Sequence, residues 1–455
     1  MSPKFGTSGL RGLVVDLTED LVADYVRAFI AAVPYGNGVF VGRDLRPSSP
    51  EIAGAAVRAV RQQGIDAFDC GVVATPALAM AAIEAGSAAI MVTGSHIPSD
   101  RNGLKFYTPE GEITKQHEAD ILAHLGVPPD KGQLGAQHHR DAVSGFKNRY
   151  ISAFGQNALL GVHIGVYSHS TAGRDMLQDI LHALGANVTE LGRSEEFIPV
   201  DTEAVHPDVR VQLAKWAAEG SFHAIVSMDG DGDRPLLTDA TGKVVAGDLL
   251  GHITARALGA QTVVTPVSSN TAIDLDGFAK VERTRIGSPY VIAGMERAKG
   301  RTVGYEANGG FLLGFDAHTR SGMLPALMTR DSVLPIVATL IESRACGVAS
   351  LCMALPSRFT AADRLQEVPT EQTQKLVAAL REDATPFLSC IDATLKSADL
   401  TDGLRMNLED GRIVHLRPSG NAPEMRLYVE ASSEALAEET LQDGLSALQR
   451  LLGGQ

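Results

Sequence analysis

Three aspartates alternate with glycines in one short segment, and they follow directly after the apolar run Ala224–Met228. The glycines let the chain turn tightly, so the carboxylates of Asp229, Asp231 and Asp233 can converge on one side of the loop. Hard anionic oxygens at this spacing suit Mg²⁺ or Ca²⁺, and Mg²⁺ is the ion that we expect in a cell. The segment therefore predicts a site for one Mg²⁺ per chain at the end of a buried strand.

Two other interpretations of this segment can be weighed from its residues. An EF-hand loop also begins with alternating aspartates, but it requires Gly at position 6 and Glu at position 12. Arg234 and Ala240 stand at those positions, so an EF-hand is excluded. An apolar strand that runs into Asp-x-Asp is also typical of aspartyl-phosphate phosphatases of the haloacid dehalogenase type, with Asp229 as the nucleophile. The segment by itself leaves that alternative open.

A serine occupies a second loop that follows an apolar strand, in residues 93–98 (TGSHIP). Gly94 allows a sharp turn that presents the Ser95 hydroxyl, and His96 and Lys105 add positive or proton-donating groups nearby. The nucleophile elbow of the α/β-hydrolases is not matched, because an isoleucine stands where its second glycine would be. Taken alone, the loop fits a reactive serine and a turn serine beside a core histidine equally well.

Two further loops have residues that suit a phosphorylated sugar. The segment 417–421 (RPSGN) offers a guanidinium fork, a hydroxyl and free backbone amides, which can surround a phosphate dianion. Glu306 and Asn308 are two residues apart, so in an extended loop they can point the same way toward vicinal sugar hydroxyls. Considered alone, the first loop is a weak signal that a polar turn explains, and a glycine-rich hairpin explains the second equally well. The segments 5–12 and 42–46 add arginine to what we expect to be flexible surface loops.

The elements that must position these loops alternate between apolar strands and amphipathic helices in three successive stretches. A helix, a glycine stop and a buried strand recur, and Ala-Leu-Gly-Ala stands before a new strand at both 183–186 and 257–260. This order is typical of βαβ units in mixed or parallel sheets. The expected strands are 39–42, 88–93, 162–167, 224–228, 262–266 and 302–305, and the expected helices are 51–63, 175–184, 249–258 and 290–299.

The C-terminal part of the chain differs, because a polar helix at 370–382 precedes strands at 403–408, 413–417 and 426–430 and a terminal helix at 436–452. The predicted fold class is therefore α/β, with three tandem α/β (mixed-sheet) domains plus a smaller C-terminal α+β domain around a central cleft. The expected domains are 1–135 with the serine loop, 136–246 with the metal loop, 247–350 with the sugar-binding loop and 351–455 with the phosphate-binding loop.

Length and charge limit the classes of function. A chain of 455 residues is too long for one ordinary core and suggests about three or four domains. The net charge of −14 argues against nucleic acid and membrane as partners, and it requires local cations wherever a phosphate binds. The four cysteines are scattered, and no apolar run approaches the ~18 residues of a membrane span. We expect a cytoplasmic protein with reduced thiols and no signal peptide.

The order of the four loops, over a span from Phe5 to Ala431, resembles the α-D-phosphohexomutase superfamily of phosphoglucomutases, phosphomannomutases and their relatives. The metal loop and the serine loop are the specific parts of this resemblance. It implies that Ser95 becomes phosphorylated, that a phosphoserine oxygen completes the metal site, and that Arg234 orients the serine phosphate. It also implies proton handling and charge stabilisation by Arg11 and Lys105 beside His96, sugar binding by Glu306 and Asn308, and binding of the non-reacting phosphate by Arg417, Ser419, Gly420 and Asn421.

The segment 284–288 resembles another loop of the family's third domain, so Arg285 and Ser288 are expected to contact the substrate, although some members have histidine where Ser288 stands. Other departures are Gly94 for alanine, Ile97 for asparagine, Asn308 for a hydroxyl residue and Asn421 for threonine. These departures leave the reaction class intact but weaken any inference about the sugar. From the overall likeness of the serine and phosphate loops, phosphomannomutase activity is expected ahead of phosphoglucomutase activity.

The implied activity is the interconversion of hexose 6-phosphate and hexose 1-phosphate. Phosphorylated Ser95 gives its group to one end of the sugar phosphate, a hexose 1,6-bisphosphate turns over in the cleft, and the other phosphate returns to Ser95. The expected partners are small-molecule hexose phosphates, with the 1,6-bisphosphate as activator, and the oligomeric state is left open. An aspartyl-phosphate phosphatase remains the alternative enzyme. A non-catalytic sugar-phosphate-binding protein is the third hypothesis, and it leaves the Ser95 loop without a task.

Overall fold

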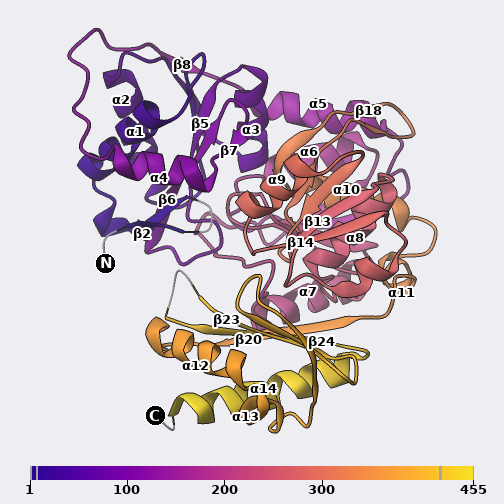
Figure 1. The fold of residues 1–455 in the computed structure, drawn as a ribbon. Coiled ribbons are helices and arrows are strands. Elements are labelled where there is room, and N and C mark those ends of the chain that lie inside the picture. Colours follow the sequence, from indigo (N-terminus) through magenta and orange to yellow (C-terminus); the bar gives the residue numbers. More distant parts are fainter. Residues whose placement is uncertain (1–2, 7–8, 420–422, 454–455) are drawn as a thin grey trace.

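The computed structural model describes residues 3–6, 9–419 and 423–453. These residues form four large sheets with covering helices, and we refer to each of these sheets with its helices as a domain, I to IV in chain order. Figure 1 shows domain I at the upper left, domains II and III beside it, and domain IV below them. None of the helices in the described ranges is long and apolar enough to cross a membrane.

Domain I is built on an eight-stranded mixed sheet in the order β1-β2-β6-β5-β3-β4-β8, with β7 paired to β6. Its central strand, β3, alternates its side chains: Val39 and Val41 pack with α1 and α2, and Phe40 packs with α3 on the opposite face. The strands are β1 Lys4–Phe5, β2 Leu10–Leu13, β3 Val39–Arg43, β4 Ala67–Val72, β5 Ala88–Val92, β6 Arg101–Thr108, β7 Gly111–Glu112 and β8 Gln137–His139. The helices are η1 Val14–Asp16, α1 Glu19–Ala32, α2 Ser49–Gln62, α3 Thr75–Glu84 and α4 Lys115–Ala123.

Domains II and III repeat this mixed arrangement with smaller sheets, in the orders β10-β9-β11-β12 and β14-β13-β15-β16-β19. In each sheet the first three strands are parallel and the remaining strands join antiparallel. Domain II has α5 Val143–Phe154, β9 His163–Tyr167, α6 Arg174–Ala183, β10 Asn187–Leu191, α7 Pro207–Gly220, β11 Ala224–Met228 and β12 Pro235–Leu237. Domain III has α8 Gly247–Ala257, β13 Thr262–Pro266, η2 Thr271–Leu275, β14 Lys280–Thr284, α9 Ser288–Arg297, β15 Thr302–Tyr305, β16 Phe311–Leu313, β17 Ala317–His318, β18 Met323–Leu324, β19 Leu327–Asp331, α10 Val333–Glu342 and α11 Val348–Met353.

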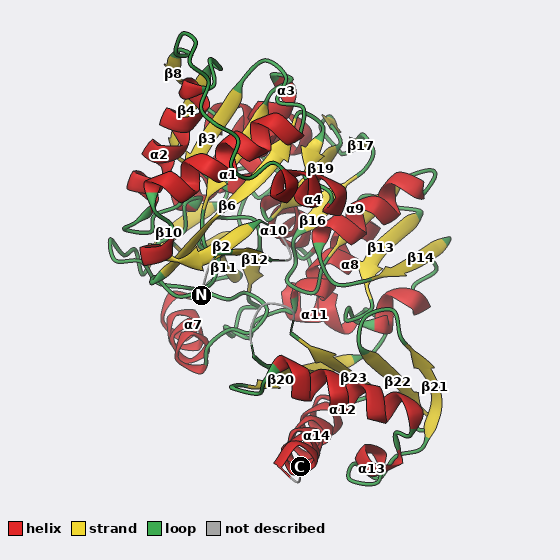
Figure 2. Cartoon of the chain, turned by 60° about the vertical axis from the view of Figure 1, so that its left-hand side comes forward, coloured by secondary structure: helices red, strands yellow, loops and turns green. Residues whose placement is uncertain are grey.

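Domain IV is a five-stranded antiparallel sheet in the order β20-β24-β23-β22-β21. Its helices lie on the face of the sheet that points away from the other domains (Figures 1 and 2). Along β24, Met425 and Leu427 enter the apolar core, while Arg426 and Tyr428 line the cleft on the other face. The elements are β20 Phe359–Leu365, α12 Thr370–Glu382, α13 Thr385–Leu388, β21 Leu395–Asp399, β22 Leu404–Leu408, β23 Ile413–Pro418, β24 Met425–Ala431 and α14 Glu434–Gly453.

One continuous apolar core joins the first three domains, whereas domain IV has a core of its own. Side chains of α3 in domain I, α6 in domain II and α10 in domain III belong to the shared core. Domain IV meets domain III through polar contacts, such as the hydrogen bond from Thr271 N to Glu430 Oε2 at 3.0 Å. A cleft of about 1390 Å³ lies where the four domains meet.

The mixed sheets and the separate α+β domain confirm the predicted fold class. The strands predicted at 224–228, 262–266 and 302–305 and the helix predicted at 370–382 begin and end where expected. The first sheet continues to β8, beyond residue 135, because β8 pairs in parallel with β4. The domain boundaries given above stay predictions.

Candidate active site

Ser95 follows β5 in a conformation that side chains rarely adopt. Its φ of 54° lies in the left-handed region, which persists in a non-glycine residue only where the surroundings hold it. Its hydroxyl donates a hydrogen bond to Asp229 Oδ2 at 2.6 Å and lies 3.2 Å from His96 Nδ1. The structure therefore brings the predicted nucleophile of domain I against the first aspartate of the metal loop in domain II.

The buried side chain of Arg46 holds the serine loop through hydrogen bonds to its backbone. The expectation of a flexible surface loop at 42–46 is wrong, because Arg46 is only 1% exposed. Phe197 of domain II covers the guanidinium, with its ring centroid 4.2 Å from Cζ, and a Cβ at Gly94 would lie 2.6 Å from that carbon. The guanidinium donates hydrogen bonds of 2.6–2.9 Å to four backbone carbonyls, those of Ser95, Ile97, Pro98 and Arg101.

Asp44 is the buried counter-charge of Arg46, and it connects that arginine to the serine by a second route. Its Oδ2 accepts hydrogen bonds from Arg46 Nε at 3.2 Å and from Thr93 Oγ1 at 2.7 Å. Thr93 Oγ1 in turn accepts a hydrogen bond from Ser95 N at 2.7 Å. Burial raises the pKa of Asp44, and the Arg46 charge opposes this rise. A buried ion pair therefore fixes the backbone around Ser95. Arg46 binds the carbonyls of the loop, and Asp44 connects through Thr93 to the Ser95 amide.

Asp229, Asp231 and Asp233 are fully buried, and each contributes one carboxylate oxygen to a cluster within 4.8 Å. Lys105 Nζ donates to Asp231 Oδ2 at 2.5 Å and to Asp233 Oδ2 at 2.6 Å. The Oδ1 atoms of Asp231 and Asp233 have no hydrogen-bond partner among the described residues. An unpartnered buried carboxylate oxygen is costly, and hard oxygen ligands in this number fit a divalent cation. The structure thus brings together the three aspartates whose spacing predicted a metal site, and their oxygens form a group that could hold a divalent ion.

Positive charges surround these carboxylates. Burial and the neighbouring Arg234 lower the pKa of Arg11 to about 10. Burial, followed by the charges of Arg234 and Arg11, lowers the pKa of His96 well below its ordinary value, so its imidazole is neutral at pH 7. Burial opposes ionisation of Asp233, but Arg330 and Lys105 outweigh it and lower the pKa of that carboxyl. The cations supply the local positive field that a phosphate needs on an acidic chain.

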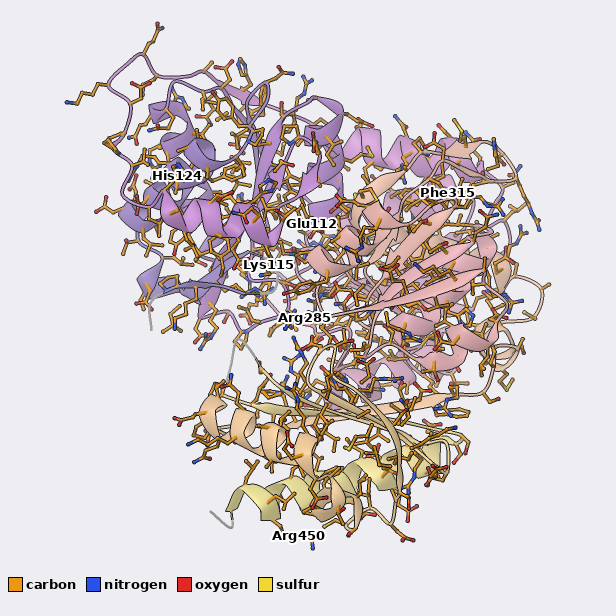
Figure 3. All side chains as sticks on the ribbon, in the orientation of Figure 1. Glu112, Lys115, His124, Arg285, Phe315 and Arg450 are labelled. Atoms are coloured by element: carbon orange, nitrogen blue, oxygen red, sulfur yellow. The ribbon has the colours of Figure 1, made fainter. Side chains whose placement is uncertain are left out.

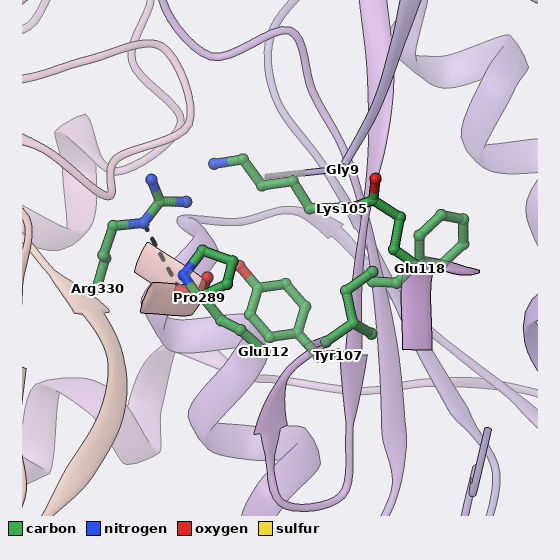
Figure 4. A pocket seen from close by; sticks show the side chains of 9 residues that line it. Gly9, Lys105, Tyr107, Glu112, Glu118, Pro289 and Arg330 are labelled. Atoms are coloured by element: carbon green, nitrogen blue, oxygen red, sulfur yellow. Dashed lines mark ion pairs between the residues drawn. The ribbon is translucent and has the colours of Figure 1, made fainter. Parts of the chain in front are cut away.

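Arg330, on β19, is a site residue that the sequence did not reveal. Its Nη2 lies 2.9 Å from Asp233 Oδ2, its Nε 3.6 Å from Glu112 Oε1, and its Nη1 3.7 Å from Glu306 Oε2. Figure 4 shows the pair with Glu112 beside a small cavity that Lys105 also lines, and its volume of about 20 Å³ has room for one water molecule. Arg330 therefore ties domains I, II and III together next to the metal site.

Glu306 and Asn308 lie between β15 and β16, and both line the cleft. Asn308 Oδ1 accepts a hydrogen bond from Gly310 N at 3.0 Å, which closes a tight turn. Glu306 Oε2 accepts no hydrogen bond from the described residues, and burial raises the pKa of this carboxyl. Glu306 Oε2 is buried and faces Arg330 Nη1 at 3.7 Å, while the side-chain amide oxygen of Asn308 is used within the loop. Their role in sugar binding stays a prediction.

Arg417 and Ser419 line the same cleft from the end of β23 in domain IV. Arg417 Nε donates to Asp402 Oδ1 at 3.1 Å, and Ser419 N donates to Glu424 O at 2.9 Å. Arg426, which the sequence analysis missed, lines the cleft from β24, where it pairs with Arg417 of β23. The other two residues of the predicted phosphate loop, Gly420 and Asn421, lie outside the described residues.

Arg285 and Ser288 are placed differently from the other predicted site residues, because neither lines the cleft in the described structure. Ser288, the first residue of α9, donates its hydroxyl to Glu112 Oε2 at 2.7 Å. Arg285 is exposed, with its guanidinium carbon 5.4 Å from the Tyr290 ring centroid. Figure 3 shows Arg285 where domains I and III approach domain IV. Substrate contact by these two residues stays a prediction.

The assembled site places a serine hydroxyl beside a metal site and several cations, and it opens to a cleft with further arginines on the far side. A hydroxyl in these surroundings suits the transfer of a phosphoryl group, because phosphoryl transfer depends on positioning and on neutralising negative charge. The arginines of domain IV add further positive charge on the far side of the cleft.

Comparison with known protein families agrees with this chemistry. Three family models match the chain, all described as phosphoglucomutase/phosphomannomutase: alpha/beta/alpha domain I at residues 2–126, alpha/beta/alpha domain III at 238–339 and the C-terminal domain at 364–444. A phosphomannomutase of Sinorhizobium fredii is 45% identical, over 98% of this chain and 99% of its own length. A phosphomannomutase of Salmonella muenchen is 42% identical, over 99% of this chain and 96% of its own length.

A solved structure shows the same fold over the whole chain. The crystal structure of a phosphoglucomutase/phosphomannomutase family protein from Burkholderia thailandensis matches with a TM-score of 0.80 and covers 98% of each chain. The two sequences are 22% identical, so this match speaks for the fold alone.

Proposed function

The chain belongs to the α-D-phosphohexomutase superfamily, and on this premise we propose that it interconverts mannose 6-phosphate and mannose 1-phosphate, with Ser95 as the phosphoryl carrier. It is an isomerase of the phosphotransferase (mutase) class. The observation that carries the proposal is the hydrogen bond from the Ser95 hydroxyl to Asp229, which supports Ser95 as a nucleophile beside the proposed metal ligands. Two phosphomannomutases that are 42–45% identical over nearly the full length support mannose phosphates as the substrates.

In the forward half-reaction, the bond between Ser95 Oγ and phosphorus breaks while a bond forms from a sugar hydroxyl oxygen to the same phosphorus. The sugar hydroxyl gives its proton to a base of the site, and the released Ser95 oxygen takes up a proton. In the described structure, where Ser95 carries no phosphate, its hydroxyl donates to Asp229 Oδ2. Lys105, Arg11 and His96 surround this position and are our candidates for holding or moving the proton.

We assign Asp229, Asp231 and Asp233, with a phosphoserine oxygen, as the ligands of one Mg²⁺. When bound, this ion supplies positive charge that offsets the charge of the phosphoryl oxygens. The unpartnered Oδ1 atoms of Asp231 and Asp233 support this assignment, because they remain available while Lys105 holds the Oδ2 atoms. Arg234, whose backbone N donates to Asp229 Oδ1 at 3.2 Å, is assigned to orient the serine phosphate.

The substrate lies across the cleft in this proposal, with its non-reacting phosphate at domain IV. Arg417 and Ser419 line that side of the cleft, and Gly420 and Asn421 belong to the same proposed loop. Glu306 accepts hydrogen bonds from sugar hydroxyls. The hexose 1,6-bisphosphate forms when the first transfer is complete and turns within the cleft, which has a volume of about 1390 Å³. The same bisphosphate, added from outside, activates an enzyme whose Ser95 has lost its phosphate.

The test is a panel of mannose, glucose and N-acetylglucosamine 1-phosphates, each assayed for conversion to the 6-phosphate with a trace of the 1,6-bisphosphate. We expect conversion of all hexoses that bind, with the highest kcat/KM for mannose 1-phosphate. A higher kcat/KM for glucose 1-phosphate would overturn the sugar assignment and leave the reaction class standing. Release of inorganic phosphate as the main product would instead identify a phosphatase.

A further inference from the structure

Asp402 joins the proposed phosphate clamp to a loop of domain III. It lies in the turn between β21 and β22, and its carboxylate accepts two hydrogen bonds from different domains. Oδ1 accepts from Arg417 Nε at 3.1 Å, and Oδ2 accepts from the backbone N of Ile286 at 2.9 Å. Arg417 and Ile286 both line the cleft, whereas Asp402 lies behind them. One carboxylate thus contacts a residue that lines the cleft from domain IV and a residue that lines it from domain III.

The turn that carries Asp402 is fixed within domain IV. His415 Nε2 donates to Asp402 O at 2.5 Å, and Arg381 Nη2 donates to the next carbonyl, Gly403 O, at 2.9 Å. Gly403 has a φ of 85°, and a Cβ there would lie 2.3 Å from Leu416 O, so only glycine fits. Because the turn is held at these points, the position of the Asp402 carboxylate follows the position of the whole domain.

The domain III loop at residues 285–287 is fixed at its other end by domain I. Ser288 follows this loop directly and donates its hydroxyl to Glu112 Oε2, and Glu112 Oε1 also faces Arg330 Nε at 3.6 Å. The loop therefore has a contact to domain I through Ser288 and a contact to domain IV through Ile286. A chain of contacts therefore runs from Asp402 through the 285–288 segment to Glu112. From Glu112 it continues to Arg330, which pairs with Asp233.

We propose that Asp402 is a positioning residue that aims the Arg417 guanidinium into the cleft and couples the seating of domain IV to the 285–287 loop. This inference rests on the proposed function, because it takes Arg417 as a phosphate ligand. A guanidinium held at Nε keeps its orientation while its terminal nitrogens can form the paired hydrogen bonds that phosphate accepts. Without Asp402, Arg417 loses this orientation and domain IV loses its tie to Ile286.

The first test measures backbone hydrogen exchange at Ile286 in the full-length protein without substrate, so it does not depend on activity. Asp402→Ala removes the acceptor, so exchange of the Ile286 amide should accelerate at least ten-fold over wild type. Asp399→Ala is the matched control, since Asp399 ends β21 just before that turn and its Oδ1 accepts a local hydrogen bond, from Thr401 N at 2.8 Å. The control should leave exchange at Ile286 within about two-fold of wild type. Equal exchange in wild type and Asp402→Ala would overturn the tie between the domains.

The second test separates positioning from chemistry by comparing KM and kcat. Asp402→Ala should raise KM for the hexose 1-phosphate about ten-fold and change kcat less than three-fold, because the residue touches no reacting atom. Arg417→Ala should raise KM by a similar factor, and the double variant should resemble Arg417→Ala alone, since both changes act through one guanidinium. Asp402→Asn, which keeps one acceptor oxygen and replaces the other with an amide NH2 that only donates, should lie between wild type and Asp402→Ala.

Two results would show that Asp402 does not act through Arg417. One is a KM of the double variant raised by the product of the two single effects, and the other is an unchanged KM in Asp402→Ala. Wild-type turnover of the sugar panel is measured in the same series. If wild type converts no hexose phosphate, the proposed function fails, while exchange at Ile286 still decides whether Asp402 ties domain IV to domain III.

Discussion

The Ser95 hydroxyl donates a hydrogen bond to Asp229 Oδ2 at 2.6 Å, although 134 residues separate the two in the sequence. The bond crosses from domain I to domain II, and it joins the two loops whose residues suggested chemistry most strongly. Both Ser95 and Asp229 were candidate nucleophiles in the sequence, so the bond joins the two residues in which the alternative enzymes differ. Here the aspartate accepts a hydrogen bond from the serine, which suits a metal ligand beside a reactive hydroxyl.

Ser95→Ala should abolish the conversion of hexose 1-phosphate, because no other hydroxyl lies against Asp229 in the described structure. Purified wild type should carry phosphate on Ser95 that survives acid, whereas an acyl phosphate on Asp229 would be lost in alkali. Peptide mapping of the labelled protein, with circular dichroism to confirm folding, makes the comparison. Label on Asp229 together with an active Ser95→Ala variant would support the aspartyl-phosphatase instead.

Asp231→Asn should reduce turnover at least 100-fold, because it removes one charge from the proposed Mg²⁺ ligands and from the partner of Lys105. A readout independent of activity is the effect of Mg²⁺ on thermal unfolding, since an ion that binds the folded state alone raises Tm. Millimolar Mg²⁺ should raise Tm of wild type and leave that of Asp231→Asn unchanged. Asp208→Asn, at a carboxylate that is 92% exposed, serves as the control. Full activity of wild type in chelator contradicts the assignment.

Arg46→Gln should destabilise the protein by about 3–5 kcal/mol, because it leaves the buried Asp44 without its cation. It should also lower kcat more than ten-fold with little change in KM, since the serine loop loses the donors to its four carbonyls. Arg46→Lys keeps the charge and should lose less stability, but it should show the same fall in kcat. Urea unfolding and initial rates provide the data, with Arg58→Gln, at an exposed arginine, as the control. A wild-type kcat in both Arg46 variants would mean that the arginine does not position Ser95.

Asp248→Asn should stabilise the protein, and the gain should grow with pH. Asp248 is 5% exposed, its Oδ2 accepts a hydrogen bond from Asn270 N at 2.8 Å, and its Oδ1 has no partner among the described residues. Burial, with a contribution from Glu430 that Arg283 opposes, raises the pKa of Asp248 to about 6. Ionised Asp248 therefore costs folding free energy, up to about 3 kcal/mol.

The sign follows from the two states. Below about pH 4 the carboxyl is protonated in both folded and unfolded chains, so the cost is absent. Above about pH 6 it is ionised in both, and the full cost applies. The difference in Tm between Asp248→Asn and wild type should accordingly be small at pH 4 and rise to a plateau above pH 7. A difference that does not change with pH would show that Asp248 is not the titrating group.

Much of the secondary structure could be predicted because its signal is local. The strand 224–228 is an unbroken apolar run bounded by polar residues, and α12 has a helical pattern, so both were predicted with their observed ends. Strand β14, Lys280–Thr284, went unrecognised because it is rich in charged residues and lies at the edge of its sheet. Strand β14 is stabilised by its pairing with β13, and this pairing cannot be inferred from the residues of β14 alone.

The candidate site divides in the same way. The metal triad and the Glu306–Asn308 pair could be found from their spacing, because neighbouring residues in a loop are close whatever the rest of the chain does. Arg330 could not be predicted in this way. Its ion pairs are with Glu112, Asp233 and Glu306, which lie far from it in the sequence or in other loops, and no short motif surrounds it. Arg46 was found but misjudged, because arginine is mostly exposed in proteins, and the partners that bury it come largely from other segments.

By itself, the sequence predicted the reaction class through its resemblance to a family. Its glycine spacing and residue types also made the three aspartates and Ser95 the candidates for a metal site and a nucleophile. Only the tertiary structure decided that Arg46 is buried, that Ser288 bonds Glu112 rather than lining the cleft, and that Asp402 connects Arg417 to Ile286. The physical reason is that a charged or hydroxyl side chain takes its role from its partner. Those partners come from other domains, and the packing of the apolar cores brings them within hydrogen-bonding distance.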